Sequence, residues 1–164
     1  VIIATHSDQA LAMLADPTSA EREVLGAIAY QPNEAVLHTD ESLMPRRRSA
    51  WASWNVHLLE EPTGLTSLTY DMNRLQRIET AGTRFLVTLN RTGMIDPAKV
   101  IRRIGYDHPV FTNAGMRAQE RWGQISGADR IHYCGAYWRN GFHEDGVVSG
   151  LAVARAFESS RVPA

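Results

Sequence analysis

The residues best suited to chemistry lie in one stretch that reads as a short strand, a glycine-containing turn and a helix. The apolar run 131–134 stops at Gly135. Asp145 then offers a side-chain cap for a helix. The backbone N–H groups of 146–148, just after that cap, would point toward an anion or a carbonyl oxygen. The spacing therefore predicts a site for a negatively polarised ligand edge at the start of this helix.

A stripe of small residues runs along the same predicted helix. Gly146, Gly150 and Ala154 recur at every fourth position, so one side of the helix carries almost no side chain. A glycine inside a helix costs about 1 kcal/mol relative to alanine. Two of them predict that a flat ligand or a strand lies close to the helix backbone. A tightly packed helix without a ligand is the structural alternative.

Two segments carry a resemblance to flavin-containing amine oxidases. Tyr133-Cys-Gly-Ala followed by His143-Glu-Asp-Gly-Val-Val-Ser-Gly-Leu-Ala-Val-Ala resembles the C-terminal flavin-contacting strand and helix of that family. Leu43-Met-Pro-Arg-Arg-Arg-Ser-Ala-Trp-Ala-Ser-Trp-Asn resembles a run in bacterial amine-oxidase-like flavoproteins. The resemblance implies FAD as the cofactor. The residues it implies as cofactor contacts are Gly135, Asp145, Gly146 and Val147.

The resemblance also implies aromatic residues that face a substrate beside the flavin. The candidates are Trp54, Tyr137 and Trp138. Trp51 and Trp54 would lie on opposite faces of an extended segment, so one would anchor the core and the other would line a pocket. The implied reaction is oxidation of a small organic substrate, such as an amine, by hydride transfer to the flavin. No catalytic side chain is identified.

Composition limits the classes of partner. The chain has 164 residues, of which 44% are hydrophobic, enough for the core of one compact unit. The formal net charge of -1 leaves no broad basic surface, so neither nucleic acid nor an anionic membrane is expected as a partner. A single cysteine excludes an internal disulfide framework. Without an apolar run long enough to span a bilayer, a cytoplasmic location is the expectation.

Other chemistries find less support in the sequence. No two of the six histidines stand in H-x-x-x-H spacing, so no metal site is expected. Cys134 lies in an apolar run, where an inert buried thiol is the expectation. The G-x-G-x-x-G turn that receives the FAD pyrophosphate is missing from this sequence. We therefore expect weak or no FAD binding by this chain alone, and a separate N-terminal dinucleotide-binding portion in a longer protein.

Strands and helices can be placed from local signals. Apolar runs or alternation of apolar and polar residues predict strands over 1–5, 34–39, 65–72, 85–89 and 99–106. Pro109 is expected to limit the last of these strands. Ser7 is the predicted cap of a first helix, Thr18 and Glu21 form the capping box of a second, and Thr112 caps a helix that reaches about Trp122.

These elements predict an α+β fold with a mainly antiparallel mixed sheet and flanking helices. Residues 31–127 would form the sheet of the substrate region. Residues 1–30 and 128–164 would supply the β-α elements that complete an FAD-binding Rossmann-like domain, the whole forming a single compact unit. The alternative to an oxidoreductase is a non-catalytic ligand-binding or interaction domain that lacks its own cofactor.

Overall fold

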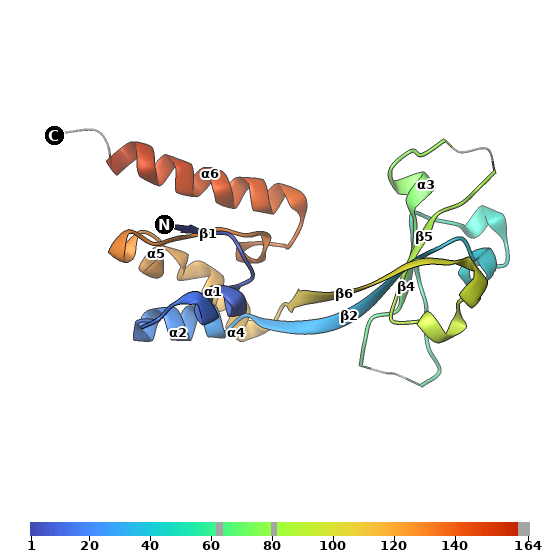
Figure 1. Cartoon of the computed structure of the whole chain (residues 1–164), viewed down its shortest axis with the longest axis horizontal. Coiled ribbons are helices and arrows are strands. Elements are labelled where there is room, and N and C mark those ends of the chain that lie inside the picture. The colour runs from blue at the N-terminus through green and yellow to red at the C-terminus, as the bar shows by residue number, and fades with distance from the viewer. Residues whose placement is uncertain (62–63, 80–81, 161–164) are drawn as a thin grey trace. The chain divides into compact units, whose positions relative to one another are not determined.

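The computed structural model describes residues 1–61, 64–79 and 82–160. The chain divides into two compact units: unit 1 comprises Val1–Gln31 and Pro109–Ala164, and unit 2 comprises Pro32–His108. A parallel strand pair with helices makes up unit 1, and an antiparallel sheet makes up unit 2 (Figure 1). The predicted α+β class is thus confirmed. Residues 109–127, which the sequence placed with the sheet, belong to unit 1, and 161–164 lie outside the described residues.

Unit 1 is layered around two very short strands. β1 (Ile2–Ile3) pairs in parallel with β7 (His132–Tyr133), and Ile3 lies opposite Tyr133. Figure 1 shows α6 (His143–Ser160) on one side of this pair, with α1, α2 and α4 on the other. The parallel pairing brings the carboxyl ends of both strands to the same edge.

The other helices of unit 1 begin at local capping signals. They are α1 (Ser7–Met13), α2 (Ser19–Gly26), α4 (Asn113–Glu120) and α5 (Trp122–Ile125). The predicted capping box of α2 is confirmed, because the Thr18 hydroxyl accepts the Glu21 N–H and the Glu21 carboxylate accepts the Thr18 N–H. His6 rather than Ser7 is the residue that caps α1, since the Gln9 side chain reaches back to the His6 N–H.

A buried carboxylate ties α2 to β7 in the core of unit 1. Glu21 is only 7% exposed, and the hydroxyl of the fully buried Tyr133 donates a hydrogen bond to it. Burial by itself raises the pKa of Glu21, but the hydrogen bonds from Tyr133 and Thr18 outweigh it and hold the pKa below its usual value. Apolar side chains surround this pair, among them Ile3, Val24, Leu25 and Ile125.

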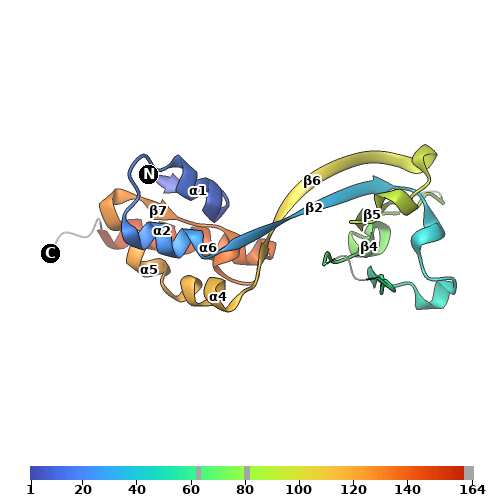
Figure 2. The same ribbon diagram turned by 90° about the horizontal axis from the view of Figure 1, so that it is seen from below.

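The sheet of unit 2 has the strand order β3-β4-β5-β2-β6. Its strands are β3 (Trp54–Val56), β4 (Leu68–Asp71), β5 (Leu86–Leu89), β2 (Ala29–His38) and β6 (Val100–Val110), and the short α3 (Met72–Leu75) follows β4. Figure 2 shows β2 and β6 running side by side. The predicted end near residue 106 is wrong, because Pro109 lies within β6, an edge strand that can do without one backbone donor.

A chain of polar side chains crosses one face of this sheet. The Oγ1 atom of Thr88 lies 2.7 Å from Nε2 of His38 and 2.8 Å from Oγ1 of Thr69, which in turn lies 2.8 Å from Nε2 of His57. The Asp40 N–H donates to Nδ1 of His38 at 3.0 Å, so a neutral His38 carries its proton on Nε2. Burial lowers the pKa of His38 and favours this neutral form.

The segment that follows β2 covers the same face of the sheet. Trp51 is 9% exposed and packs with Met44 and Leu86, so it is the tryptophan that anchors the core. Asp40 is 2% exposed and bonds to the Asp96 N–H at 2.9 Å and to Nζ of Lys99 at 3.1 Å. Burial opposes the charge of Asp40, yet these hydrogen bonds outweigh it and hold the pKa of the carboxyl far below its usual range.

Candidate functional site

The strand ends of unit 1 form the first candidate site, here called the carboxyl edge. It comprises the residues just beyond β1 and β7, including His6, Ser7 and Gly135. The Cys134 N–H donates to the Ile3 carbonyl at 3.0 Å, so both strands stop at the same level. Ligands of open sheets with parallel strands bind outside the carboxyl ends of the strands. The fold thus puts Gly135 where such a ligand would lie.

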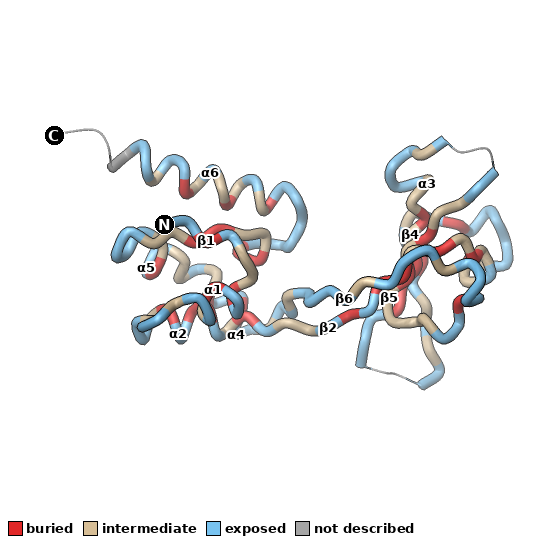
Figure 3. The backbone as a smooth tube through the Cα atoms, in the orientation of Figure 1, coloured by how far each residue is buried: buried red, intermediate tan, exposed pale blue. Residues whose placement is uncertain are grey.

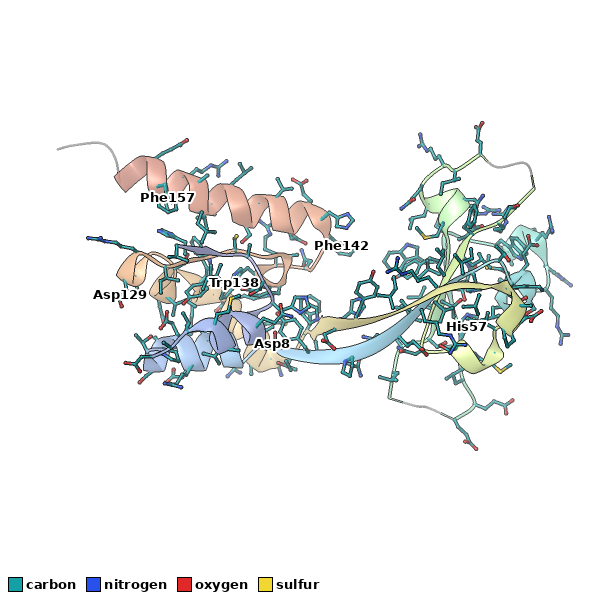
Figure 4. The ribbon with its side chains drawn as sticks, in the orientation of Figure 1. Asp8, His57, Asp129, Trp138, Phe142 and Phe157 are labelled. Atoms are coloured by element: carbon teal, nitrogen blue, oxygen red, sulfur yellow. The ribbon has the colours of Figure 1, made fainter. Side chains whose placement is uncertain are left out.

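The turn at Gly135 is built around an aromatic ring. A Cβ on this residue would lie 2.4 Å from Cε1 of Tyr137, so a side chain here would collide with that ring. The Gly135 N–H donates to Oγ of Ser149 at 3.1 Å, which ties the turn to α6. Tyr137 contacts Trp138 with ring centroids 5.0 Å apart, and both rings lie in the core of unit 1. Figure 4 shows Trp138 between the layers of this unit.

The start of α6 differs from the sequence prediction. The helix begins at His143, and the Asp145 carboxylate reaches back to accept the Phe142 N–H at 3.0 Å while it pairs with Arg139 Nε at 3.3 Å. The Gly146 N–H donates to the Phe142 carbonyl at 3.2 Å, so it is not free for a ligand. The N–H groups exposed by the helix end are those of 143–145. Asp145 acts from the third helical position because a carboxylate there can bond the residue before the helix.

The small-residue stripe of α6 makes little close contact in the described part of the chain. A Cβ on Gly146 would meet only the Cβ of Ala136, at 3.9 Å, and a Cβ on Gly150 would meet nothing within 4 Å. Val147 is 55% exposed. The helix instead packs through a neighbouring stripe of buried positions: Asp145, Ser149 and Val153. No described strand approaches the glycines closely, so the predicted reason for them is not found within unit 1.

Several buried polar atoms at the carboxyl edge have no hydrogen-bond partner among the described residues. They are Nδ1 of His6, Oγ of Ser7 and the hydroxyl oxygen of Tyr137. The His6 ring stacks on Tyr30 with centroids 4.5 Å apart, and the Ser7 N–H donates to the Tyr30 hydroxyl. Buried polar atoms are normally paired. This edge therefore keeps hydrogen-bonding capacity that a ligand could use.

The single cysteine of the chain lies beside this edge but is not activated. Cys134 is buried, and burial raises the pKa of its thiol. Thiolates are the reactive form of cysteine.

Among the described residues, no three His, Cys, Asp or Glu side chains gather as a metal ion would need. None of the helices in the described part of the chain is long and apolar enough to cross a membrane.

Unit 2 offers a second candidate site on one face of its sheet, here called the apolar face. The strand register places Trp54, Tyr70, Val87 and Leu37 in one row across four strands. Trp54 is 51% exposed and contacts Tyr70 edge-to-face with centroids 5.2 Å apart. A cavity of about 390 Å³ opens on this face next to Val87 and Leu37. Trp54, a predicted substrate contact, thus stands in a row that leads to a cavity.

The predicted site residues fall into two groups. Gly135, Asp145, Gly146 and Val147 lie together around the turn and the start of α6 in unit 1, where Tyr137 and Trp138 are core residues that support the turn. Trp54 belongs to unit 2. The sequence reasoning missed the cavity residues Phe85, Ile104 and Tyr106. The alternation of apolar residues over 85–89 was the signal that could have identified Phe85.

Comparison with known proteins gives a likeness of fold to solved structures. No family model and no curated protein matches the chain. Among solved structures, the crystal structure named "Putative protoporphyrinogen oxidase" from Exiguobacterium sp. 255-15 matches with a TM-score of 0.61 and 13% sequence identity. The match covers 98% of this chain and 41% of that one. The chain therefore shares the fold of a part of that structure, and spans less than half of its length.

Proposed function

We propose that the chain is part of an FAD-dependent oxidoreductase of the amine-oxidase type, in which unit 1 contacts the flavin and unit 2 faces the substrate. The observation that carries the proposal is the likeness of fold, over 98% of the chain, to a structure named as an oxidase. The motif at Gly135 and at the start of α6 supports it. The proposed substrate is a small organic molecule, such as an amine, and the proposed location is the cytoplasm.

The carboxyl edge fits the edge of a flavin ring. The unpartnered atoms of His6 and Ser7 and the N–H groups at the start of α6 can donate to, or accept from, a polar ring. Glu144 and Asp145 weaken the attraction for a negative charge, although Asp145 is already paired with Arg139. Bound FAD would supply the redox chemistry by accepting a hydride from a substrate carbon. The proposed contacts remain Gly135, Asp145, Gly146 and Val147.

The chain's own residues would hold and orient the cofactor. Tyr137 and Trp138 would keep the Gly135 turn rigid below the ring, and Trp54 would form part of the substrate wall. The N–H groups of 143–145 would stabilise charge on the ring edge, as oriented donors do in a site shielded from water. The pyrophosphate would need a G-x-G-x-x-G turn, which this sequence lacks, so we propose that a separate dinucleotide-binding portion supplies it.

Two measurements test this proposal. Calorimetric titration of the 164-residue chain with FAD should show weak or no binding, and submicromolar affinity would contradict the need for another portion. In a longer protein that includes the dinucleotide-binding portion, Gly146→Leu should abolish flavin retention, measured by absorbance. Gly150→Leu is the matched control, since a Cβ there meets nothing within 4 Å. Full flavin content in Gly146→Leu would remove the cofactor role from this helix.

The alternative is a ligand-binding domain without a cofactor. The missing pyrophosphate turn and the cavity on the apolar face favour it. The two functions differ in what Asp145→Ala does in the longer protein. An oxidoreductase should keep most of its flavin and show a lower reduction potential, because the frayed helix start would stabilise the reduced ring less well. A binding domain should show only the loss of a helix cap, about 1 kcal/mol of stability.

A further inference from the structure

The sheet of unit 2 buries its polar face and leaves its apolar face open. Asn55, Thr69, Thr88 and Val36 form one cross-strand row, and all four are buried. The adjacent row lies on the other face and consists of Trp54, Tyr70, Val87 and Leu37. The Trp54 side chain in this row is half exposed. In Figure 3 the buried positions of unit 2 gather along β4 and β5. An antiparallel sheet usually hides its apolar side. An open apolar face marks an interaction surface.

The concave part of the apolar face is the cavity of about 390 Å³. It falls within the range of roughly 300–1,000 Å³ that is typical of small-molecule sites. The strands provide its floor and the residues of and after α3 provide a wall. Its lining comprises Ala35, Leu37, Met72, Gln76, Ile78, Phe85, Val87, Ile104 and Tyr106. The wall makes this part of the face a pocket rather than a flat patch.

The lining also defines the charge of a ligand. None of the nine residues is an aspartate, glutamate, lysine, arginine or histidine, and only Gln76 and Tyr106 carry a strong hydrogen-bonding group. An ammonium or a carboxylate would lose its hydration here without meeting an opposite charge. Another cavity of unit 2, of about 550 Å³, is lined by Arg48, Arg74 and Glu79. The two cavities adjoin at Ile78, which lines both, but charged side chains line only the larger one.

We propose that this pocket binds an uncharged, mainly apolar small molecule with one neutral hydrogen-bonding group, such as a hydroxyl or a carbonyl. Leu37, Val87 and Ile104 contact its apolar body, and Tyr106 or Gln76 bonds its polar group. The identification of this ligand as a substrate rests on the proposed function, but its binding does not. An oxidoreductase with this pocket takes its substrate in a neutral form rather than as an ammonium ion.

The test uses the 164-residue chain without flavin. N-phenyl-1-naphthylamine, an uncharged fluorescent probe, should bind with increased emission. Competitors of one shape then displace it: 1-naphthalenemethanol, 1-naphthylmethylammonium and 1-naphthoate. The alcohol should displace the probe at concentrations at least about tenfold lower than either ion. Equal or better displacement by the ammonium overturns the proposal, and so does absence of probe binding. Since no flavin is present, failure of the chain to bind FAD leaves this result unaffected.

Two isoleucines of β6 provide a matched pair of variants. Ile104 lines the pocket, whereas Ile101 on the same strand is 52% exposed and does not. Ile104→Glu should weaken binding of the neutral probe and strengthen that of the ammonium, while Ile101→Glu should change neither. Equal effects of the two variants overturn the assignment of the pocket.

If thermal melting shows that Ile104→Glu is unfolded, the double variant Tyr106→Phe with Gln76→Leu tests the pocket instead. This double variant should abolish the preference for 1-naphthalenemethanol over 1-methylnaphthalene, and an unchanged preference overturns the polar contact.

Discussion

The buried pair of Glu21 and Tyr133 yields the sharpest test of how unit 1 is held together. Tyr133→Phe removes one hydroxyl and leaves the ring in place. The Glu21 carboxylate then keeps only its two hydrogen bonds from Thr18, at 2.8 and 2.9 Å. A hydrogen bond to a charged buried group contributes about 1.5–3 kcal/mol. We expect Tyr133→Phe to lower the free energy of unfolding by that amount at pH 7.

The pH dependence of this loss follows from the pKa of Glu21. In the native chain that pKa is below its usual value of 4.5, so the carboxylate adds stability above pH 4.5 that is lost as the pH falls through the folded-state pKa. In the variant, burial is opposed by Thr18 alone and the pKa of Glu21 rises. The difference in stability between the native chain and the variant should therefore be largest at pH 7 and should shrink below about pH 4.

Urea denaturation at pH 7 and pH 3.5, followed by circular dichroism, measures both quantities. Tyr70→Phe is the control, because Tyr70 is half-buried and its hydroxyl has no carboxylate partner among the described residues. It should change stability by no more than about 0.5 kcal/mol. A Tyr133→Phe loss no larger than that of the control, or a loss of equal size at the two pH values, would refute the reasoning.

Three further outcomes are expected. Gly135→Ala should lower the melting temperature, because its Cβ would lie 2.4 Å from the Tyr137 ring, whereas Gly150→Ala should stabilise α6 by up to about 1 kcal/mol. Asp40→Asn should lower the free energy of unfolding by about 2–3 kcal/mol in urea titrations at pH 7. The effect should be smaller below pH 3.8, because the stability that the Asp40 carboxylate contributes is lost as the pH falls. His38→Gln should reduce the loss of stability below pH 6.5, which arises because burial lowers the pKa of His38 and the unfolded chain therefore takes up the proton more readily than the folded chain.

Structural features that depend only on residues close together in the sequence could be predicted from it. The capping box of Thr18 and Glu21 needs only a three-residue spacing, and the structure contains it. The alternation over 85–89 reflects the two faces of a strand, and β5 lies there. The boundary of unit 2 was not readable, because α4 and α5 join unit 1 by packing against α2, about 90 residues earlier in the chain.

The candidate site was less predictable for the same physical reason. A carboxylate at Asp145 can cap a helix that follows it or bond backward from inside the helix, and only the position of Phe142 decides which. Aromatic residues after a turn can face a ligand or the core. Tyr137 and Trp138 lie in the core, held there by packing with α1, α2 and α4 that local spacing does not encode.

The chain of hydrogen bonds from His38 to His57 also bears on how the sheet of unit 2 finds its pairing. If β5 slipped by one residue, Thr88 would turn to the opposite side and Val87 would take its place between His38 and Thr69. Nε2 of His38 would then be buried without a hydrogen bond, at a cost of about 1–3 kcal/mol, and Oγ1 of Thr69 would keep only its contact with His57. Apolar contacts alone would tolerate such a slip more easily. The buried threonines therefore favour the native register of the strands over a register shifted by one residue. Thr88→Val should let sheets with a shifted register accumulate during refolding.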